Sequence, residues 1–124
     1  MKTPEQMAKS LYELLLDDSA GCYDTTVDLF EDQVEYEDQG GKIGIDFGTK
    51  TFTITGHILE VFNCETRSEV GDYINEDTTH IGFYQRGEAT YASITYQFKT
   101  FEDLKNEMLD HTVFMYLDLD KVFN

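Results

Sequence analysis

The sequence predicts a single α+β domain in which helices pack on one antiparallel sheet. Apolar residues recur every three to four positions near the N-terminus and every second position through most of the remaining chain, which is typical of a helix before a series of strands. The expected turns are too short for the crossovers that parallel strands require. No repeat or linker divides residues 1–124, and 40% of the residues are hydrophobic, enough for one core.

The first expected element is a helix that begins at the Thr3-Pro4 pair. Threonine is a good N-cap, proline is favoured at the first helical position, and Gln6 stands where a capping box bonds back to the cap. Asp17 and Asp18 in the last turn oppose the helix dipole, a placement that helix stability alone would not select. The apolar stripe of this helix consists of Met7, Leu11, Leu14 and Leu15.

Alternating polarity then predicts an antiparallel meander. Val34 and Tyr36 alternate with Glu35 and Glu37, which predicts a half-buried strand with an acidic outer face. The stretch 25–30 fits a short helix or a strand equally well. Glycine-rich turns separate the strands. The strands expected here cover residues 34–37, 43–47, 52–54 and 58–62.

The second half is expected to hold a polar loop at 65–79 and a hairpin with strands at 80–84 and 89–98. Thr100 is the expected N-cap of a second helix, packed through Phe101, Leu104 and Met108. The helices should cover one face of the sheet and leave the other partly solvated. The chain should finish with a last strand at 113–117 and one helical turn after it.

The charge of the chain is its most informative feature. It has 25 Asp and Glu against 9 Lys and Arg, a formal net charge of -16. Between Lys9 and Lys42 there are ten carboxylates and no basic residue. Because like charge on a compact body costs stability, the excess indicates a use, and the simplest use is to bind a strongly basic partner. The same charge disfavours direct binding to nucleic acid or to anionic membranes.

Enzymatic chemistry has no support in the sequence. A nucleophile elbow, a phosphate loop, a metalloprotease helix motif and a dinucleotide fingerprint are all absent. The three histidines lie far apart, and Cys22 and Cys64 lack metal-site spacing, so we expect reduced thiols, no catalysis and no cofactor. Without a long apolar run or a signal-peptide core, we expect a cytoplasmic protein.

A divalent-cation or small-ligand site is one alternative. Glu35, Glu37, Gln39, Gly40 and Asp46 repeat the spacing of a calcium loop. In such loops, however, the first ligand is normally Asp and the last a bidentate Glu, between two helices. The segment here predicts strand, turn and strand, so a hairpin explains it better than a metal site.

The function that we expect is protein inhibition through mimicry of the nucleic-acid backbone. Duplex DNA carries one charge per ~1.7 Å, so sixteen charges correspond to about 27 Å of duplex, against a width of roughly 35 Å for this domain. In size and charge, and in no motif, the chain resembles small phage and plasmid anti-CRISPR and anti-restriction inhibitors. The other alternative is an immunity or antitoxin protein that neutralises a basic nuclease toxin, because such a protein would bind its partner through the same attraction between opposite charges.

The expected contacts fall in two groups of acids and a few tyrosines, since exposed aromatics often dominate binding energy. We call the first group the acidic strip: Asp17, Asp18, Asp28, Glu31, Asp32, Glu35, Glu37 and Asp38. The second group lies in the expected loop: Glu65, Glu69, Asp72, Glu76 and Asp77. The candidate aromatic anchors are Tyr23, Tyr73, Tyr84 and Tyr91.

Overall fold

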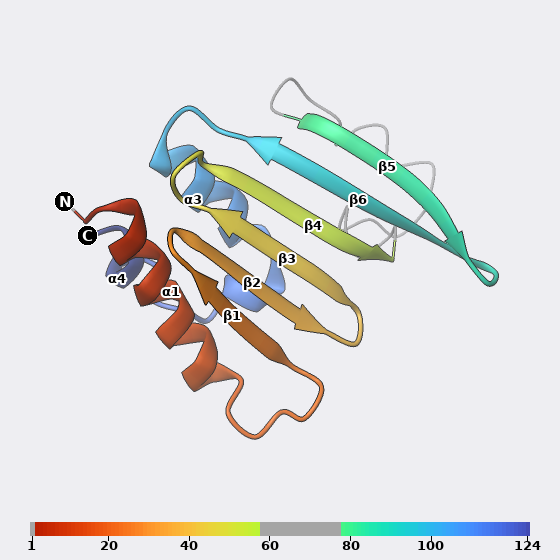
Figure 1. Cartoon of the computed structure of the whole chain (residues 1–124), viewed down its shortest axis with the longest axis horizontal. Helices are drawn as coiled ribbons and strands as arrows, with labels where there is room; N and C mark the ends of the chain where they lie inside the picture. The colour runs from red at the N-terminus through yellow and green to blue at the C-terminus, as the bar shows by residue number, and fades with distance from the viewer. Residues whose placement is uncertain (1, 58–77) are drawn as a thin grey trace.

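The computed structural model describes residues 2–57 and 78–124, which form one twisted sheet with helices on one of its faces (Figure 1). The strands are β1 (Thr26–Phe30), β2 (Gln33–Asp38), β3 (Gly41–Asp46), β4 (Thr51–His57), β5 (Thr78–Arg86) and β6 (Ala89–Gln97). The helices are α1 (Pro4–Asp18), α3 (Phe101–Leu109), the 3-10 turn η2 (Thr112–Phe114) and α4 (Asp120–Phe123). The strand expected at 58–62 lies outside the described residues.

The six strands are all antiparallel to their neighbours, in the order β1-β2-β3-β4-β6-β5. The first four follow one another along the chain as a meander, and the ambiguous stretch 25–30 supplies its outer strand, β1. The hairpin of β5 and β6 then joins the sheet through β6, which pairs with β4. The expected α+β architecture, a meander plus a hairpin, is therefore confirmed.

The capping box at the start of α1 forms as expected. The Gln6 backbone N–H donates to Thr3 Oγ1 at 3.2 Å, and the Thr3 N–H donates to Gln6 Oε1 at 2.9 Å. These bonds satisfy two donors that would otherwise have no partner within the helix. The apolar stripe of α1 faces β1, β2 and α4. Of the expected stripe, Met7, Leu11 and Leu15 are fully buried and Leu14 is partly buried, and Ala8 is buried beside them.

The core lies between the sheet and the helices. Strand alternation sends every second side chain of β2, β3, β4 and β6 inward, because successive side chains point to opposite faces. Phe52 is 0% exposed, and its ring centroid lies 4.9 Å from that of His111 and 6.3 Å from that of Phe114. The segment that follows α3, which includes η2, therefore packs on β4 and covers this part of the core.

The strand expected at residues 113–117 is wrong. Residues 112–114 form η2, and the Leu117 N–H donates to the Phe114 carbonyl at 3.2 Å, so the chain keeps coiling. Phe114 is buried while Met115 and Tyr116 are 56% and 86% exposed, a one-sided burial that fits a helical turn and not a pleat. A short apolar run does not distinguish the two structures, since both can bury it.

Tyr96 on β6 is 7% exposed, and its ionisation makes the stability of the fold depend on pH in the alkaline range. Burial, and after it the charge of Glu107, raises the pKa of Tyr96 from 10.0 to about 12. A tyrosine with a raised pKa favours folding below its unfolded pKa, and this contribution is lost as pH rises through the folded pKa. We expect the free energy of unfolding to fall by on the order of 2 kcal/mol between about pH 10 and 12 through this group.

The measurement is urea unfolding across this pH range in the parent and in Tyr96→Phe. The variant has no phenol to ionise at this position, so its stability should decline less by about that amount. Parallel pH curves for the two proteins would contradict the assignment.

Candidate functional site

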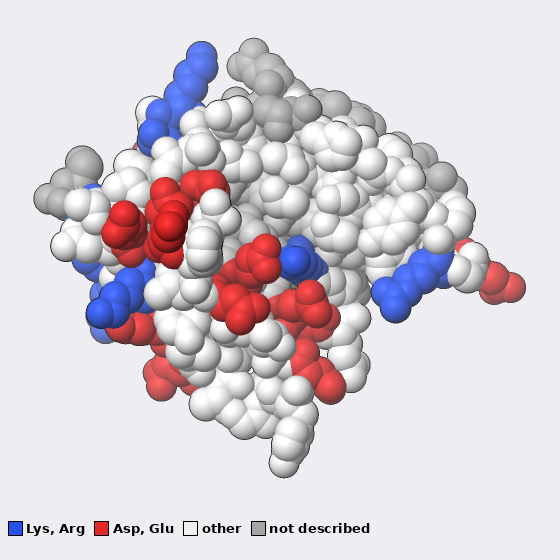
Figure 2. All heavy atoms as spheres, viewed as in Figure 1, with Lys and Arg blue, Asp and Glu red and all other residues white. Residues whose placement is uncertain are grey.

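The face of the sheet opposite the helices is not covered by any described element, and we call it the open face. Its side chains are those that alternate with the core residues along each strand. Figure 2 shows acidic side chains gathered over β1–β3 and a largely uncharged area over β4 and β6. The open face therefore has an acidic half and a neutral half.

Carboxylates from three adjacent strands form the acidic half. Asp28 on β1 stands directly opposite Glu35 on β2, and Glu37 stands opposite Lys42 on β3. Lys42 Nζ lies 3.3 Å from Glu35 Oε2, and Lys42 is the single basic residue of β1–β3. We call four carboxylates the acidic patch: Asp28, Glu35, Glu37 and Asp46.

The cross-strand pairing within the acidic patch opposes folding. Like charges directly opposite each other in a sheet destabilise it by a few tenths of a kcal/mol or more. One lysine cannot neutralise four carboxylates. A residue choice made only for stability would have placed a cation at position 28, opposite Glu35.

The structure divides the acidic strip. Asp28, Glu35 and Glu37 share the open face, as their alternation predicted. Asp17 and Asp18 lie at the end of α1, in the helix layer, and do not join them. Residues that are neighbours in sequence are separated here because a helix and a strand belong to different layers of the fold.

The other members of the acidic strip lie in a turn or at the end of a strand beside one. Glu31 and Asp32 form the β1–β2 turn, where Glu31 has a φ of 54°. Asp38 Oδ1 accepts hydrogen bonds from the Gly40 N–H at 2.8 Å and the Gly41 N–H at 3.0 Å. Asp38 therefore stabilises the β2–β3 turn with one of its oxygens. The second group of expected contacts, the acids at 65–77, lies outside the described residues.

Asp46 belongs to the open face, although the sequence pattern singles it out only as the last position of a calcium loop. The sequence could have predicted this position. Ile43 and Ile45 point into the core, so Lys42, Gly44 and Asp46, which alternate with them, point to the open face. In the structure the calcium-loop spacing falls on strand, turn and strand.

The carboxylate of Asp46 is engaged within the fold. Its Oδ1 accepts the Thr49 N–H at 3.1 Å in the β3–β4 turn, and its Oδ2 accepts Gln33 Nε2 at 3.1 Å from β2. In residues 2–57 and 78–124, no group of three or more His, Cys, Asp or Glu side chains is placed to hold a metal ion. Cys22 is a free, exposed thiol, and Cys64 lies outside this part of the chain.

The neutral half of the open face is built from hydroxyl pairs. Thr53 Oγ1 lies 3.2 Å from Thr95 Oγ1, and Thr55 Oγ1 lies 2.9 Å from Ser93 Oγ, across β4 and β6. A hollow of about 390 Å³ lies over Gly44, between these hydroxyls and the acidic patch. Its lining offers hydrogen bonds on one side and negative charge on the other.

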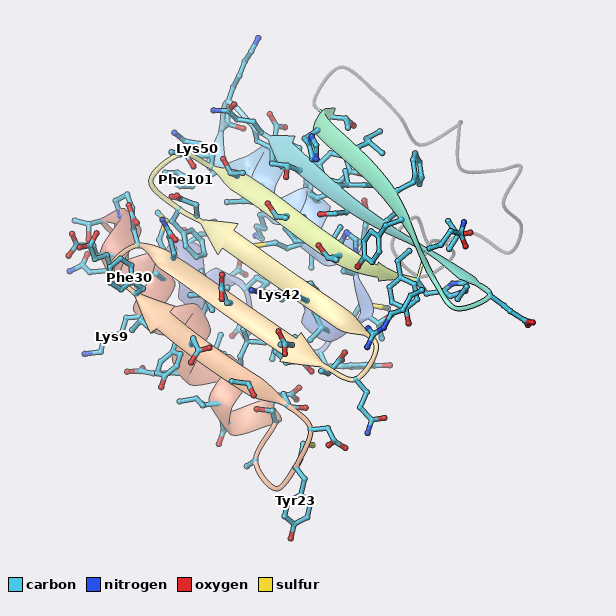
Figure 3. The ribbon with its side chains drawn as sticks, turned by 45° about the vertical axis from the view of Figure 1, so that its right-hand side comes forward. Lys9, Tyr23, Phe30, Lys42, Lys50 and Phe101 are labelled. Carbon is cyan, nitrogen blue, oxygen red and sulfur yellow. The ribbon has the colours of Figure 1, made fainter. Side chains whose placement is uncertain are left out.

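Two of the candidate aromatic anchors meet on the open face. The ring centroids of Tyr84 and Tyr91 are 5.7 Å apart, and the Arg86 guanidinium lies 5.6 Å from the Tyr91 ring. Figure 3 shows Tyr23 extending from the loop before β1, where its side chain is fully exposed. Tyr73 lies outside the described residues. Of these two tyrosines on the open face, Tyr84 is exposed and Tyr91 is half-buried.

Comparisons with protein-family models, curated proteins and solved structures find no match to this chain. Among the helices of the described residues, none is long and apolar enough to cross a lipid bilayer.

Proposed function

We propose that this protein is a non-enzymatic inhibitor whose open face occupies the basic nucleic-acid channel of a nucleic-acid-processing protein. The observation that carries the proposal is the acidic patch, in which Asp28 and Glu35 are held opposite each other on an uncovered sheet. Such a pair costs stability in the free protein, and a surface of Lys and Arg side chains removes that repulsion on binding.

The spacing of the acidic patch supports mimicry of a phosphate backbone. Side chains two positions apart on one strand, such as Glu35 and Glu37, lie ~6.6 Å apart, and side chains opposite each other on adjacent strands lie about 5 Å apart. The paired strands hold these rows in place before the partner arrives. Binding to a preorganised surface loses less conformational entropy than binding to a mobile one.

The whole-chain charge supports fast association. A body of net charge -16 produces a long-range field that attracts a basic channel. Electrostatic steering of this kind raises association rates by about 10–10³-fold and falls steeply with ionic strength. We therefore expect the affinity to drop by about tenfold or more between about 50 and 200 mM salt.

The experiment is affinity capture with the tagged chain from a nuclease-treated, host-like lysate at low and high salt, and then binding to the purified partner. Added DNA or RNA should compete with this protein for the partner. Binding that is insensitive to salt, or that nucleic acid leaves unchanged, would overturn the proposal. A toxin nuclease as the partner would make the chain an immunity protein acting through the same surface.

A further inference from the structure

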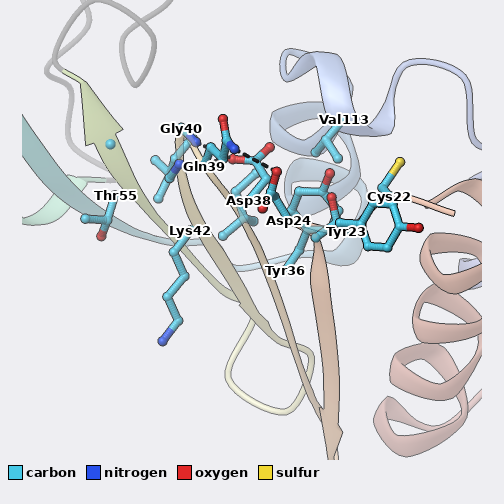
Figure 4. A pocket seen from close by; sticks show the side chains of 15 residues that line it. Cys22, Tyr23, Asp24, Tyr36, Asp38, Gln39, Gly40, Lys42, Thr55 and Val113 are labelled. Atoms are coloured by element: carbon cyan, nitrogen blue, oxygen red, sulfur yellow. Dashed lines mark hydrogen bonds between the residues drawn. The ribbon is translucent and has the colours of Figure 1, made fainter. Parts of the chain in front are cut away.

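A separate hollow lies at the end of the sheet, where β2 turns into β3 (Figure 4). Its volume is about 520 Å³, within the range of small-ligand pockets. The buried side chains of Ile43 and Ile54 and the half-buried Val113 of η2 provide its apolar surface. Asp24 and Asp38 provide its carboxylates. The hollow therefore combines an apolar wall with negative charge.

Both carboxylates are held in place through one oxygen. Asp24 Oδ2 accepts Gln39 Nε2 at 2.7 Å, and Asp38 Oδ1 accepts the N–H groups of Gly40 and Gly41. Figure 4 shows Asp24, Asp38 and Gln39 gathered on one side of the hollow. The other oxygen of each carboxylate is left to accept hydrogen bonds from a ligand.

The field inside the hollow is negative. Lys42 is the one cation among the lining residues, but it points to the open face, where it pairs with Glu35. Burial is the main cause that raises the pKa of the Tyr36 hydroxyl in the hollow. A hydrogen bond with Thr25 lowers this pKa, and the charges of nearby carboxylates, Asp38 first among them, raise it further. The same carboxylates favour a bound cation.

We propose that the hollow binds the side chain of an arginine of the basic partner. The aliphatic stem would lie on Ile43, Ile54 and Val113, and the guanidinium would donate to Asp24 and Asp38. Arginine suits this site because its planar fork offers several donors at once, while its stem is apolar. Cation binding follows from the hollow alone, and the assignment of the cation to a protein partner rests on the proposed function.

The test is an NMR titration of the whole chain with N-acetyl-arginine amide, beside the matching citrulline amide, which has the same shape without the charge. We expect saturable shifts of backbone resonances at residues 22–25, 38–43 and 113 with the arginine probe, and none with citrulline. Equal shifts from the two probes, or unsaturable shifts spread over the open face, would overturn the proposal. A lysine amide that binds as tightly would overturn the role of the guanidinium fork.

Isosteric variants test the two carboxylates. Asp24→Asn and Asp38→Asn retain the oxygen that accepts the internal hydrogen bonds and remove the charge, so an unchanged fold can be checked in the same spectra. Each should weaken the arginine probe by about tenfold or more, because a charge-assisted bond is lost. Glu5→Gln makes the same charge change in the first turn of α1, away from the hollow and from the acidic patch, and should leave the affinity within about twofold.

Equal weakening by all three variants would mean that the probe responds to overall charge, which would overturn the hollow as a site. The titration contains no partner. If the arginine probe does not bind, the predicted competition between this protein and nucleic acid is therefore not contradicted. Failure of that competition, with arginine binding retained, would instead overturn the proposed function.

Discussion

Asp28→Lys combined with Glu37→Gln should weaken partner binding by about 100-fold or more, because contacts between close opposite charges at an interface are worth several kcal/mol and act together. The two changes remove two carboxylates from the acidic patch and add a cation on its outer strand, β1. The fold should not suffer, since the change at position 28 replaces a like-charge pair with an ion pair opposite Glu35. We expect a gain of about 0.5 kcal/mol in the free energy of unfolding.

The matched control carries the same change in net charge on another layer of the fold. Asp17→Lys with Glu13→Gln alters two exposed acids one turn apart on α1 and also relieves a like-charge pair. Because only the long-range field changes, binding should weaken by about threefold to tenfold. Affinity to the purified partner and thermal unfolding of both variants are the measurements. Equal losses of affinity would show that total charge matters and the open face does not.

Phe52→Ala should lower the free energy of unfolding by about 3–5 kcal/mol. Phe52 is fully buried, and its ring meets those of Tyr96, His111 and Phe114, so truncation leaves a cavity between β4 and the segment after α3. Small domains are stable by about 5–15 kcal/mol, so the variant should retain only part of its stability.

The control for Phe52 is the same truncation at a surface position. Phe30→Ala, at the end of β1, removes a ring that is 69% exposed and should cost less than about 1 kcal/mol. Urea unfolding of both variants measures the difference. A cost below about 2 kcal/mol for Phe52→Ala would mean that η2 collapses into the space, and that the C-terminal segment is not a fixed wall of the core.

Local signals predicted most of the fold. The capping box of α1, the alternation around Val34 and the N-cap at Thr100 are chemical features within a few residues, and each produced the expected element. The run 113–117 has no such feature, because only the core that it meets decides between a turn and a strand. The insertion of β6 between β4 and β5 likewise depends on packing between distant segments.

The candidate site was less predictable than the fold. A strip of acids in sequence becomes a patch in space only where its members share a strand face, so Asp28 and Glu35 meet while Asp17 stays on α1. The sequence also did not indicate that one oxygen of Asp38 is engaged in the β2–β3 turn, where it accepts two backbone N–H groups. The hollow beside it depends on Val113 approaching from the helix layer, which no pattern near Asp24 or Asp38 could indicate.

The strand order also has a consequence for the kinetics of folding. Strands β1 to β4 pair with neighbours along the chain, whereas the Thr53–Thr95 contact between β4 and β6 joins residues 42 positions apart. Closing that long loop costs more entropy than closing a hairpin, and non-local pairing is slow. We therefore expect the meander to form first and the β5–β6 hairpin to dock last. The acidic patch, which lies entirely on β1–β3, would then be assembled before the sheet is complete.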